Sequence, residues 1–182
     1  MDPPALLTDD AGVRLRPLRE DDAPAFAAAF ADDPQLGVLV GFEEDPDEAS
    51  VRSRLERPDE RPGFELVVTA GGTDELRGVV VVHRIEERHG RAEVGFWLVR
   101  DARRAGLGRR AVALVVDWLF AHPWVRRVEI STTPENAGAM ALAERLGFTY
   151  EGTLRQRDVE RGTPVDIVWF GLLRDEWPPA GL

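Results

Sequence analysis

The chain has 182 residues, no cysteine and a formal net charge of −10 at pH 7. Its length fits one domain that buries a core without disulfides, and the absence of cysteine excludes disulfide frameworks, thiolate metal sites and cysteine nucleophiles. The negative charge disfavours nucleic acid and anionic membranes as partners, and because all 23 basic residues are arginine, lysine Schiff-base chemistry and a P-loop are excluded too.

Neither the amino-terminal segment nor the longest apolar run predicts targeting to a membrane. The first residues, MDPPALLTDD, are acidic and lack the apolar core of a signal peptide. The apolar run at 111–120 is interrupted by Asp117 and is too short to span a bilayer. We therefore expect a cytoplasmic protein that folds as one domain over residues 1–182, with a core of about 13–177.

The first part of the chain predicts one strand and two helices. Apolar and polar residues alternate over 13–18, which indicates a strand. Acidic residues then precede a helix over 24–31 that is rich in alanine and phenylalanine, and Pro46 with the acids after it starts a second helix that reaches about residue 56. The segment between these helices predicts a loop or a broken helix.

The middle of the chain predicts an antiparallel meander followed by a long helix. Three runs rich in valine and aromatic residues, at 64–70, 76–86 and 92–99, are separated by glycines and charged residues. Apolar residues then recur at helical spacing over 107–121, which indicates a helix that lies on a sheet. The fold class is therefore α/β, with a mixed sheet flanked by helices. The remaining predicted elements are a strand at 127–131, a helix at 136–146 and strands at 149–155 and 165–173.

A cluster of arginines surrounds the predicted start of the helix at 107–121. A helix N-terminus already carries about half a positive charge, so cations are unfavourable there unless an anion binds. Free backbone N–H groups, together with Gly106 and Gly108, favour a bound pyrophosphate. The alternative is a tight turn with solvated arginines, and a dinucleotide-binding fold is disfavoured because no third glycine follows Gly108. The arginines are Arg103, Arg104, Arg109 and Arg110.

Four segments carry motifs that occur together in one family. Arg103-x-x-Gly106-x-Gly108 lies between a strand and a long helix, and 93–98 reads E-V-G-F-W-L. Asn136 is followed by E-R-L-G-F at 144–148, and then by E-G-T-L-R. These motifs resemble the GNAT acetyltransferases, whose signature is R/Q-x-x-G-x-G/A. Within that family they are similar to E-I-G-Y-W-L, N … E-K-L-G-F and E-G-x-L-R of the RimJ/RimL-like branch, which modifies protein N-termini in bacteria.

The resemblance implies the GNAT fold, with acetyl-CoA as the co-substrate and no metal. That fold is a central mixed, mostly antiparallel sheet of six to seven strands flanked by about four helices, and its fourth and fifth strands splay apart to admit the pantetheine arm. Asn136 matches a coenzyme contact, although a helix N-cap explains an asparagine there equally well. The residues implied for coenzyme binding are Leu98, Val99, Arg103, Arg104, Ala105, Gly106, Leu107, Gly108, Arg109 and Asn136.

An acceptor amine must lose a proton before it attacks a thioester, because amines with a pKa of about 8 to 10 are protonated at neutral pH. Glu93 is our candidate for the catalytic base, acting directly or through water, and a solvent-facing strand glutamate is the alternative. The usual general acids of the family are missing, since Ala143 and Ala139 occupy the positions of its tyrosine and serine. Water or a hydroxyl from 131–133 could donate the proton, and the acid stays unassigned.

The other titratable residues receive no catalytic role from the sequence. We interpret His83, His89 and His122 as structural or solvated. The acidic residues between 43 and 48 resemble a solvated loop and lack the spacing of a calcium site. Because the acceptor lid of the family lies between its first two helices, we hypothesise that this loop draws a cationic amine to the cleft.

Three classes of function stay open at this point. The first is an N-acetyltransferase that works through a ternary complex, with a protein or peptide N-terminal α-amine or a small cationic amine as its acceptor. The second is a non-catalytic acyl-CoA sensor or binding subunit, which Ala139 and Ala143 would suit. The third is a nucleotide-binding module of another fold, for which the Asn136 and Gly147-Phe148 pattern has no use. We also consider a homodimer, since the strand at 165–173 offers an edge for pairing.

Overall fold

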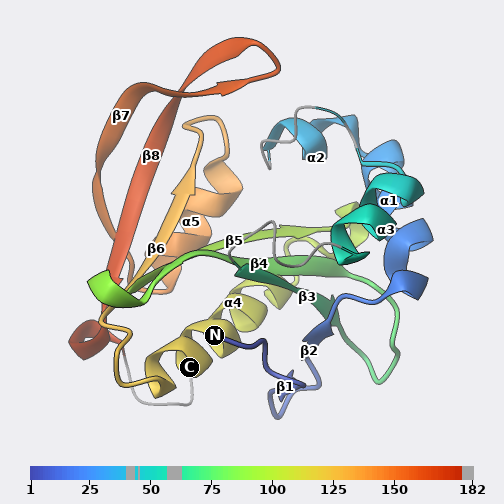
Figure 1. Ribbon diagram of the computed structural model, residues 1–182, viewed down its shortest axis with the longest axis horizontal. Coiled ribbons are helices and arrows are strands. Elements are labelled where there is room, and N and C mark those ends of the chain that lie inside the picture. The colour runs from blue at the N-terminus through green and yellow to red at the C-terminus, as the bar shows by residue number, and fades with distance from the viewer. Residues whose placement is uncertain (40–43, 45, 57–62, 178–182) are drawn as a thin grey trace.

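Eight strands form one sheet in the order β1-β2-β3-β4-β5-β6-β8-β7, within the residues that the computed structural model describes, 1–39, 44, 46–56 and 63–177 (Figure 1). The strands are β1 (Leu7–Thr8), β2 (Arg14–Pro17), β3 (Gly63–Thr69), β4 (Gly78–Glu86), β5 (Arg91–Leu98), β6 (Arg127–Thr132), β7 (Thr149–Glu160) and β8 (Thr163–Leu173). The helices are α1 (Ala23–Asp32), α2 (Pro34–Leu39), α3 (Glu48–Glu56), α4 (Leu107–Ala121) and α5 (Ala137–Arg145). None of these described helices is long and apolar enough to cross a membrane.

Helices cover both faces of the sheet (Figure 1). On one face α4 and α5 pack against alternating strand residues such as Ala92 and Val94 of β5. On the opposite face Phe26 and Phe30 of α1 make edge-on contacts with Trp97 of β5, with ring centroids 4.8 and 5.1 Å apart. Because successive residues of a strand point to opposite faces, Glu93 shares the α1 face with Trp97.

The strands β5 and β6 separate after a short parallel contact. Within the described residues, their pairing covers only Arg91–Glu93 with Arg127–Glu129. Beyond it, β5 continues beside β4 as far as Leu98, whereas β6 continues beside β8. The backbone of β5 at 94–98 therefore has an edge without a strand partner on the β6 side. This is the splay of the fourth and fifth predicted strands, and the expectation is confirmed.

The predicted elements mostly agree with the structure. The helix predicted at 107–121 is α4, with the same bounds. The sheet has eight strands instead of six to seven, because β1 is too short to carry an alternating pattern. The strand β7 extends to Glu160, beyond the predicted end at 155, because its residues are mostly exposed and leave no pattern of burial in the sequence.

The prediction of which strand forms this edge of the sheet is wrong. We expected the strand at 165–173 to be exposed for pairing with a second copy, but β8 lies between β6 and β7. The strand at the edge is β7, which joins β8 in the long hairpin at the upper left of Figure 1. In the sheet, β8 therefore precedes β7, which is the reverse of their order in the sequence. The chain forms β7 first, and the last strand, β8, then pairs with both β7 and β6.

Candidate active site

Glu93 and Glu129 are buried carboxylates on adjacent strands. They are register partners on β5 and β6, and the two residues are 2% and 6% exposed. Register partners project to the same face of a sheet, so both carboxylates lie on the face where α1 and α3 pack. Ser131 of β6 donates a hydrogen bond to Glu93 Oε1. Glu93 is therefore a buried, hydrogen-bonded carboxylate, not the solvent-facing residue of the alternative interpretation.

Glu129 belongs to a separate network of ion pairs. Arg127 Nε donates to Glu129 Oε1 at 2.7 Å, and the same guanidinium binds Glu151 of β7. The hydrogen bonds that Arg127 donates to Glu151 and Glu129 raise the pKa of Arg127. A side chain at Gly171 would overlap this guanidinium, which would then have to shift. Arg127 thus neutralises Glu129, whereas Glu93 has different neighbours.

Arg84 pairs with Glu93 through an irregularity in β4. Its Nη1 donates to Glu93 Oε2 at 2.8 Å. The register between β4 and β5 shifts between His83 and Glu86, and Arg84 adopts a left-handed backbone with φ of 47°. A bulge re-aims a side chain in this way, so His83 and Arg84 both reach Glu93 although consecutive residues of a regular strand point to opposite faces.

His83 lies beside Glu93 on the neighbouring strand. The two residues are register partners, and His83 Nε2 is 3.9 Å from Glu93 Oε1. The ring lies over Gly95, where an added Cβ would be 3.6 Å from Nε2. Burial lowers the pKa of His83, while the charge of Glu93 raises it and that of Arg84 lowers it further. Sequence reasoning missed this neighbour of Glu93, and the pairing register of the two predicted strands is the signal that could have found it.

Glu93, Ser131, Arg84 and His83 form one cluster of side chains, and Trp169 of β8 lies beside it. Trp169 is the register partner of Ser131. The guanidinium carbons of Arg84 and Arg157 lie 5.8 and 5.5 Å from the centre of its ring. Cations at this distance are attracted to the face of an indole. The β8 side of the cluster is therefore an aromatic surface with two cations against it.

The glycine loop joins the end of β5 to α4. Gly106 is the N-cap of α4 and has a left-handed backbone with φ of 79°. Arg104 is also left-handed, with φ of 66°. Gly108 lies in the first turn of α4, where a Cβ would come within 3.2 Å of Leu142 and 3.3 Å of Leu98. Gly106 thus permits the turn, whereas Gly108 permits the close packing of α4 against Leu98.

Two arginines of the predicted phosphate cradle are already paired with acids. Arg103 Nε donates to the Leu98 carbonyl at 2.9 Å, and its Nη2 lies 2.6 Å from Asp33 Oδ2. Arg110 binds Asp9 at two points, at 2.6 and 2.7 Å. These contacts relieve the repulsion between two of the four cations and the N-terminus of α4.

The other two arginines of the cradle are free to meet an anion. Arg104 is exposed and Arg109 is partly exposed, and neither forms an ion pair with a residue that the structure describes. Between them, Ala105 is exposed and the Leu107 side chain is buried in the core, so these two positions offer backbone groups. Of the four arginines of the predicted cradle, two are therefore left as cations without an acidic partner among the described residues.

Leu98 presents its backbone to the gap between β5 and β6. The Val99 N–H donates to the Arg77 carbonyl at 3.0 Å, on the β4 side. Backbone groups of consecutive strand residues point to opposite edges, so those of Leu98 point to the β6 side. Of the two residues predicted to meet the pantetheine arm, Leu98 directs its N–H to the gap while its carbonyl already accepts from Arg103, and the Val99 N–H is already bound to Arg77.

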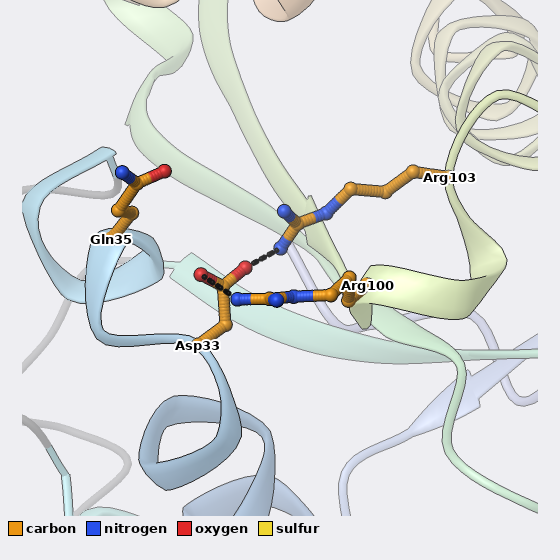
Figure 2. Close-up of a pocket in the computed structure, with 4 residues that line it drawn as sticks. All are labelled: Asp33, Gln35, Arg100 and Arg103. Atoms are coloured by element: carbon orange, nitrogen blue, oxygen red, sulfur yellow. Dashed lines mark hydrogen bonds and ion pairs between the residues drawn. The ribbon is translucent and has the colours of Figure 1, made fainter.

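A cavity of about 520 Å³ lies beside Arg103 (Figure 2). It is lined by Asp33, Gln35, Arg100 and Arg103, which come from the end of α1, from α2 and from the loop after β5. Arg100 Nη2 and Arg103 Nη2 both contact the buried Asp33 carboxylate, at 3.2 and 2.6 Å. Burial by itself raises the pKa of Asp33, but the two arginines outweigh it and hold this pKa below its usual value. These ion pairs thus connect the end of α1 to the loop between β5 and α4.

Asn136 caps α5, in agreement with one of its two interpretations. Its Oδ1 accepts a hydrogen bond from the Ala139 N–H at 3.1 Å. A contact to coenzyme A stays a prediction for its amide NH₂ group. Ala139 and Ala143 are both buried, so α5 offers no hydroxyl at the two positions where the family usually places its acid.

The acidic loop is described only in part. Glu43 and Asp45 lie outside the described residues, and Glu44 is exposed. Asp47 Oδ1 accepts a hydrogen bond from the Ser50 N–H at 2.8 Å, and this bond lowers the pKa of Asp47. Asp47 therefore starts α3, as the sequence predicted. In the parts of the chain that are described, no three His, Asp or Glu side chains converge to hold a metal.

Known proteins are similar to this chain over much of its length. A family model described as an acetyltransferase (GNAT) domain matches residues 13–149. YdaF of Bacillus subtilis, named as a candidate ribosomal N-acetyltransferase, is 27% identical over 91% of this chain and 93% of its own. The ribosomal-protein-serine acetyltransferase of Escherichia coli is 32% identical over 56% of this chain and 57% of its own. Mycobacterium smegmatis RimJ, solved in complex with CoA-disulfide, matches with a TM-score of 0.81 and 24% identity over 96% of this chain and 88% of its own, a likeness that establishes the fold.

Proposed function

The chain belongs to the GNAT family of acetyltransferases, and from that premise we propose that it transfers an acetyl group from acetyl-CoA to a primary amine. The amine attacks the thioester directly in a ternary complex, since the chain has no cysteine to carry the acyl group. Family membership supports N-acetyl transfer in general. The use of acetyl-CoA as the coenzyme and the identity of the acceptor are proposals.

The observation that carries this proposal is the open backbone edge of β5. An extended arm that bears amide groups can pair with such an edge as an added strand does. Leu98 lies at the end of this edge nearest the glycine loop, and Glu93 lies at the other end, where β5 and β6 meet. A pantetheine arm along the edge would bring its thioester toward Glu93 while its phosphates stay at the loop.

The start of α4 supplies groups for the phosphates of the coenzyme. The backbone N–H groups after Gly106 and the side chains of Arg104 and Arg109 are free for such a contact. RimJ of M. smegmatis, which has the same fold, was solved with CoA-disulfide, and this supports the same class of ligand here. The other predicted coenzyme contacts are proposals of the same kind: Leu98, Val99, Arg103, Ala105, Leu107, Gly108 and Asn136.

Deprotonation of the amine is proposed to occur beside Glu93. This carboxylate is buried and accepts hydrogen bonds from Ser131 and Arg84, so a side chain or a water must carry the proton between it and the amine. The thiol of coenzyme A, with a pKa of about 8.5, is a tolerable leaving group that water can protonate. The buried alanines of α5 therefore do not preclude turnover.

The acceptor is proposed to be the α-amine of a polypeptide. Relatives named for ribosomal proteins support this class. A small cationic amine is the second class to test, because a net charge of −10 attracts cations.

Thermal unfolding with and without acetyl-CoA tests the coenzyme. Ligand at a hundredfold excess over its Kd adds about 2.7 kcal/mol to the free energy of unfolding, which raises Tm by roughly 5–11 °C in a domain of this size. The shift should vanish in Arg104→Glu/Arg109→Glu. Release of coenzyme A is then measured with a peptide that begins with serine and with spermine. Because the chain has no cysteine, a thiol reagent reports the coenzyme alone.

The outcomes separate the two leading functions. A shift in Tm together with acceptor-dependent release of thiol supports the acetyltransferase. A shift without release from any amine supports the non-catalytic acyl-CoA-binding subunit. The absence of a shift at saturating acetyl-CoA would remove both functions.

A further inference from the structure

We propose that His83 takes the proton from the acceptor amine, and that Glu93 acts behind it as a fixed negative charge. This inference rests on the proposed function, because it assigns the base of that acetyl transfer to a particular side chain. It also changes the role of His83, which the sequence had led us to interpret as structural or solvated.

Glu93 is poorly placed to meet an amine itself. Glu93 is 2% exposed. Its Oε1 accepts a hydrogen bond from Ser131, and its Oε2 accepts a hydrogen bond from Arg84. A general base must come within roughly 2.6–3.2 Å of the group whose proton it removes. The His83 side chain is 38% exposed, and its Nε2 lies 3.9 Å from Glu93 Oε1. Its imidazole is therefore the basic group of this cluster that an amine can reach from solvent.

The charges around His83 suit a base that is neutral before the reaction. Burial and Arg84 lower its pKa, which keeps the imidazole neutral at pH 7, and Glu93 stabilises the cation that forms when the proton arrives. Glu65 of β3 also points to this face, two residues from Gly63, the register partner of His83. Of the two carboxylates, Glu93 is the one that raises the pKa of His83 against the effect of Arg84.

The proposed step conserves protons and electrons. The acceptor ammonium gives one proton to a free imidazole nitrogen of His83, and the lone pair of the resulting amine forms a C–N bond to the thioester carbon. The C–S bond breaks and its electron pair leaves with sulfur. The second proton of the nitrogen reaches the thiolate through water, and the imidazolium of His83 returns its proton to solvent.

His83→Gln tests the step because glutamine is polar and of similar size but does not accept a proton at neutral pH. With saturating acetyl-CoA and the serine peptide as the acceptor, we expect kcat at pH 7 to fall by about 100-fold or more, with little change in KM. The deficit should shrink as the pH rises through the pKa of the amine, because the acceptor then arrives without its extra proton. A merely structural role for His83 would not give this dependence on pH.

His89→Gln is the matched control. His89 Nε2 also lies 3.9 Å from a glutamate, Glu86, but on an exposed turn outside the cluster. We expect this variant to keep the kcat and the pH profile of the wild type. If His83→Gln does the same, the inference is wrong although the proposed function stands, since the wild type would still release coenzyme A.

A titration of His83 by NMR provides a second measurement that needs no acceptor. The chain has three histidines, so the imidazole signal that disappears in His83→Gln is readily assigned. In the complex with coenzyme A, we expect this signal to titrate below the usual value of 6.5, and still lower in Glu93→Gln, where the carboxylate no longer stabilises the cation. If His83 is still charged at pH 7, it cannot act as the base and the inference is overturned, whether or not the serine peptide is a substrate.

Discussion

Arg84 holds the buried carboxylate of Glu93 from a strand position that a regular β-strand would point to the opposite face. Its Nη1 lies 2.8 Å from Glu93 Oε2, and its φ of 47° marks the bulge that turns the side chain. A non-glycine residue in this conformation costs on the order of 1–3 kcal/mol, and such residues cluster at functional sites. The irregularity of β4 is therefore explained by the need to neutralise a charge in the middle of the sheet.

Arg84→Met should destabilise the protein. The carboxylate of Glu93 would stay buried with Ser131 but would lose its charged partner. Because the Arg84 side chain is 44% exposed and partly screened by solvent, we expect a loss of only about 1–2 kcal/mol in the free energy of unfolding, or roughly 2–8 °C in Tm. Thermal unfolding checks this, with Arg88→Met on the exposed turn as the control. An equal Tm for the two variants would contradict the role given to Arg84.

Substitutions at Gly95 should show whether activity depends on the space beside the His83 imidazole, independently of any effect on the stability of β5. In Gly95→Ala the new Cβ would lie 3.6 Å from His83 Nε2, an ordinary contact, and we expect activity close to that of the wild type. In Gly95→Val the additional methyl groups would displace the imidazole, and kcat should fall by about 10- to 100-fold. Steady-state kinetics of both variants, beside their Tm values, check the prediction. A Gly95→Val enzyme with normal kcat would show that the position of His83 does not matter.

Asp33 should contribute stability that depends on pH. Its pKa in the folded protein lies below its usual value of 3.8, so it binds a proton more weakly when folded than when unfolded. Its contribution is therefore fully present above pH 3.8 and is lost as the pH falls through the lower, folded pKa. We expect Asp33→Asn to lose about 1–3 kcal/mol at neutral pH, because the buried carboxylate accepts charged hydrogen bonds.

Urea unfolding of Asp33→Asn and the wild type from neutral pH down to about pH 3 checks this linkage. The difference between the two proteins should shrink at the acidic end. Asp32→Asn, an exposed neighbour, is the control, and low protein concentrations are needed because the isoelectric point is about 4.8. A difference that stays constant with pH would mean that the ion pairs in Figure 2 do not stabilise the fold.

The arginines at the start of α4 should differ in their effects on coenzyme binding. Arg104→Gln and Arg109→Gln each remove a free cation, and we expect each to raise the Kd for acetyl-CoA by about 10-fold, with a weaker dependence on salt than in the wild type. Arg110→Gln instead breaks the ion pair with Asp9, so it should lower Tm and leave the Kd nearly unchanged. Calorimetric titration at two salt concentrations measures these effects. An Arg110→Gln variant that binds acetyl-CoA as weakly as the other two would contradict the division.

Local patterns in the sequence were sufficient for most of the elements and for the glycine loop, but not for β1 or for the end of β7. The helix at 107–121 follows from apolar spacing within one segment, and the turn at Gly106 follows from the residue type. The roles of individual arginines did not follow, because Arg103 and Arg110 are paired with Asp33 and Asp9, which lie far away in the chain. Without those contacts, the four cations looked alike.

The sequence by itself determined the family and the class of fold, and it predicted the segment that we propose to meet the coenzyme, because each depends on residues that are close together along the chain. Only the tertiary structure decided which groups surround Glu93. His83, Ser131 and Arg84 come from three positions on two other strands, and they meet the carboxylate through the pairing register and through a bulge. A shift of one residue in that register would turn these side chains to the opposite face, and no local pattern in the sequence encodes it.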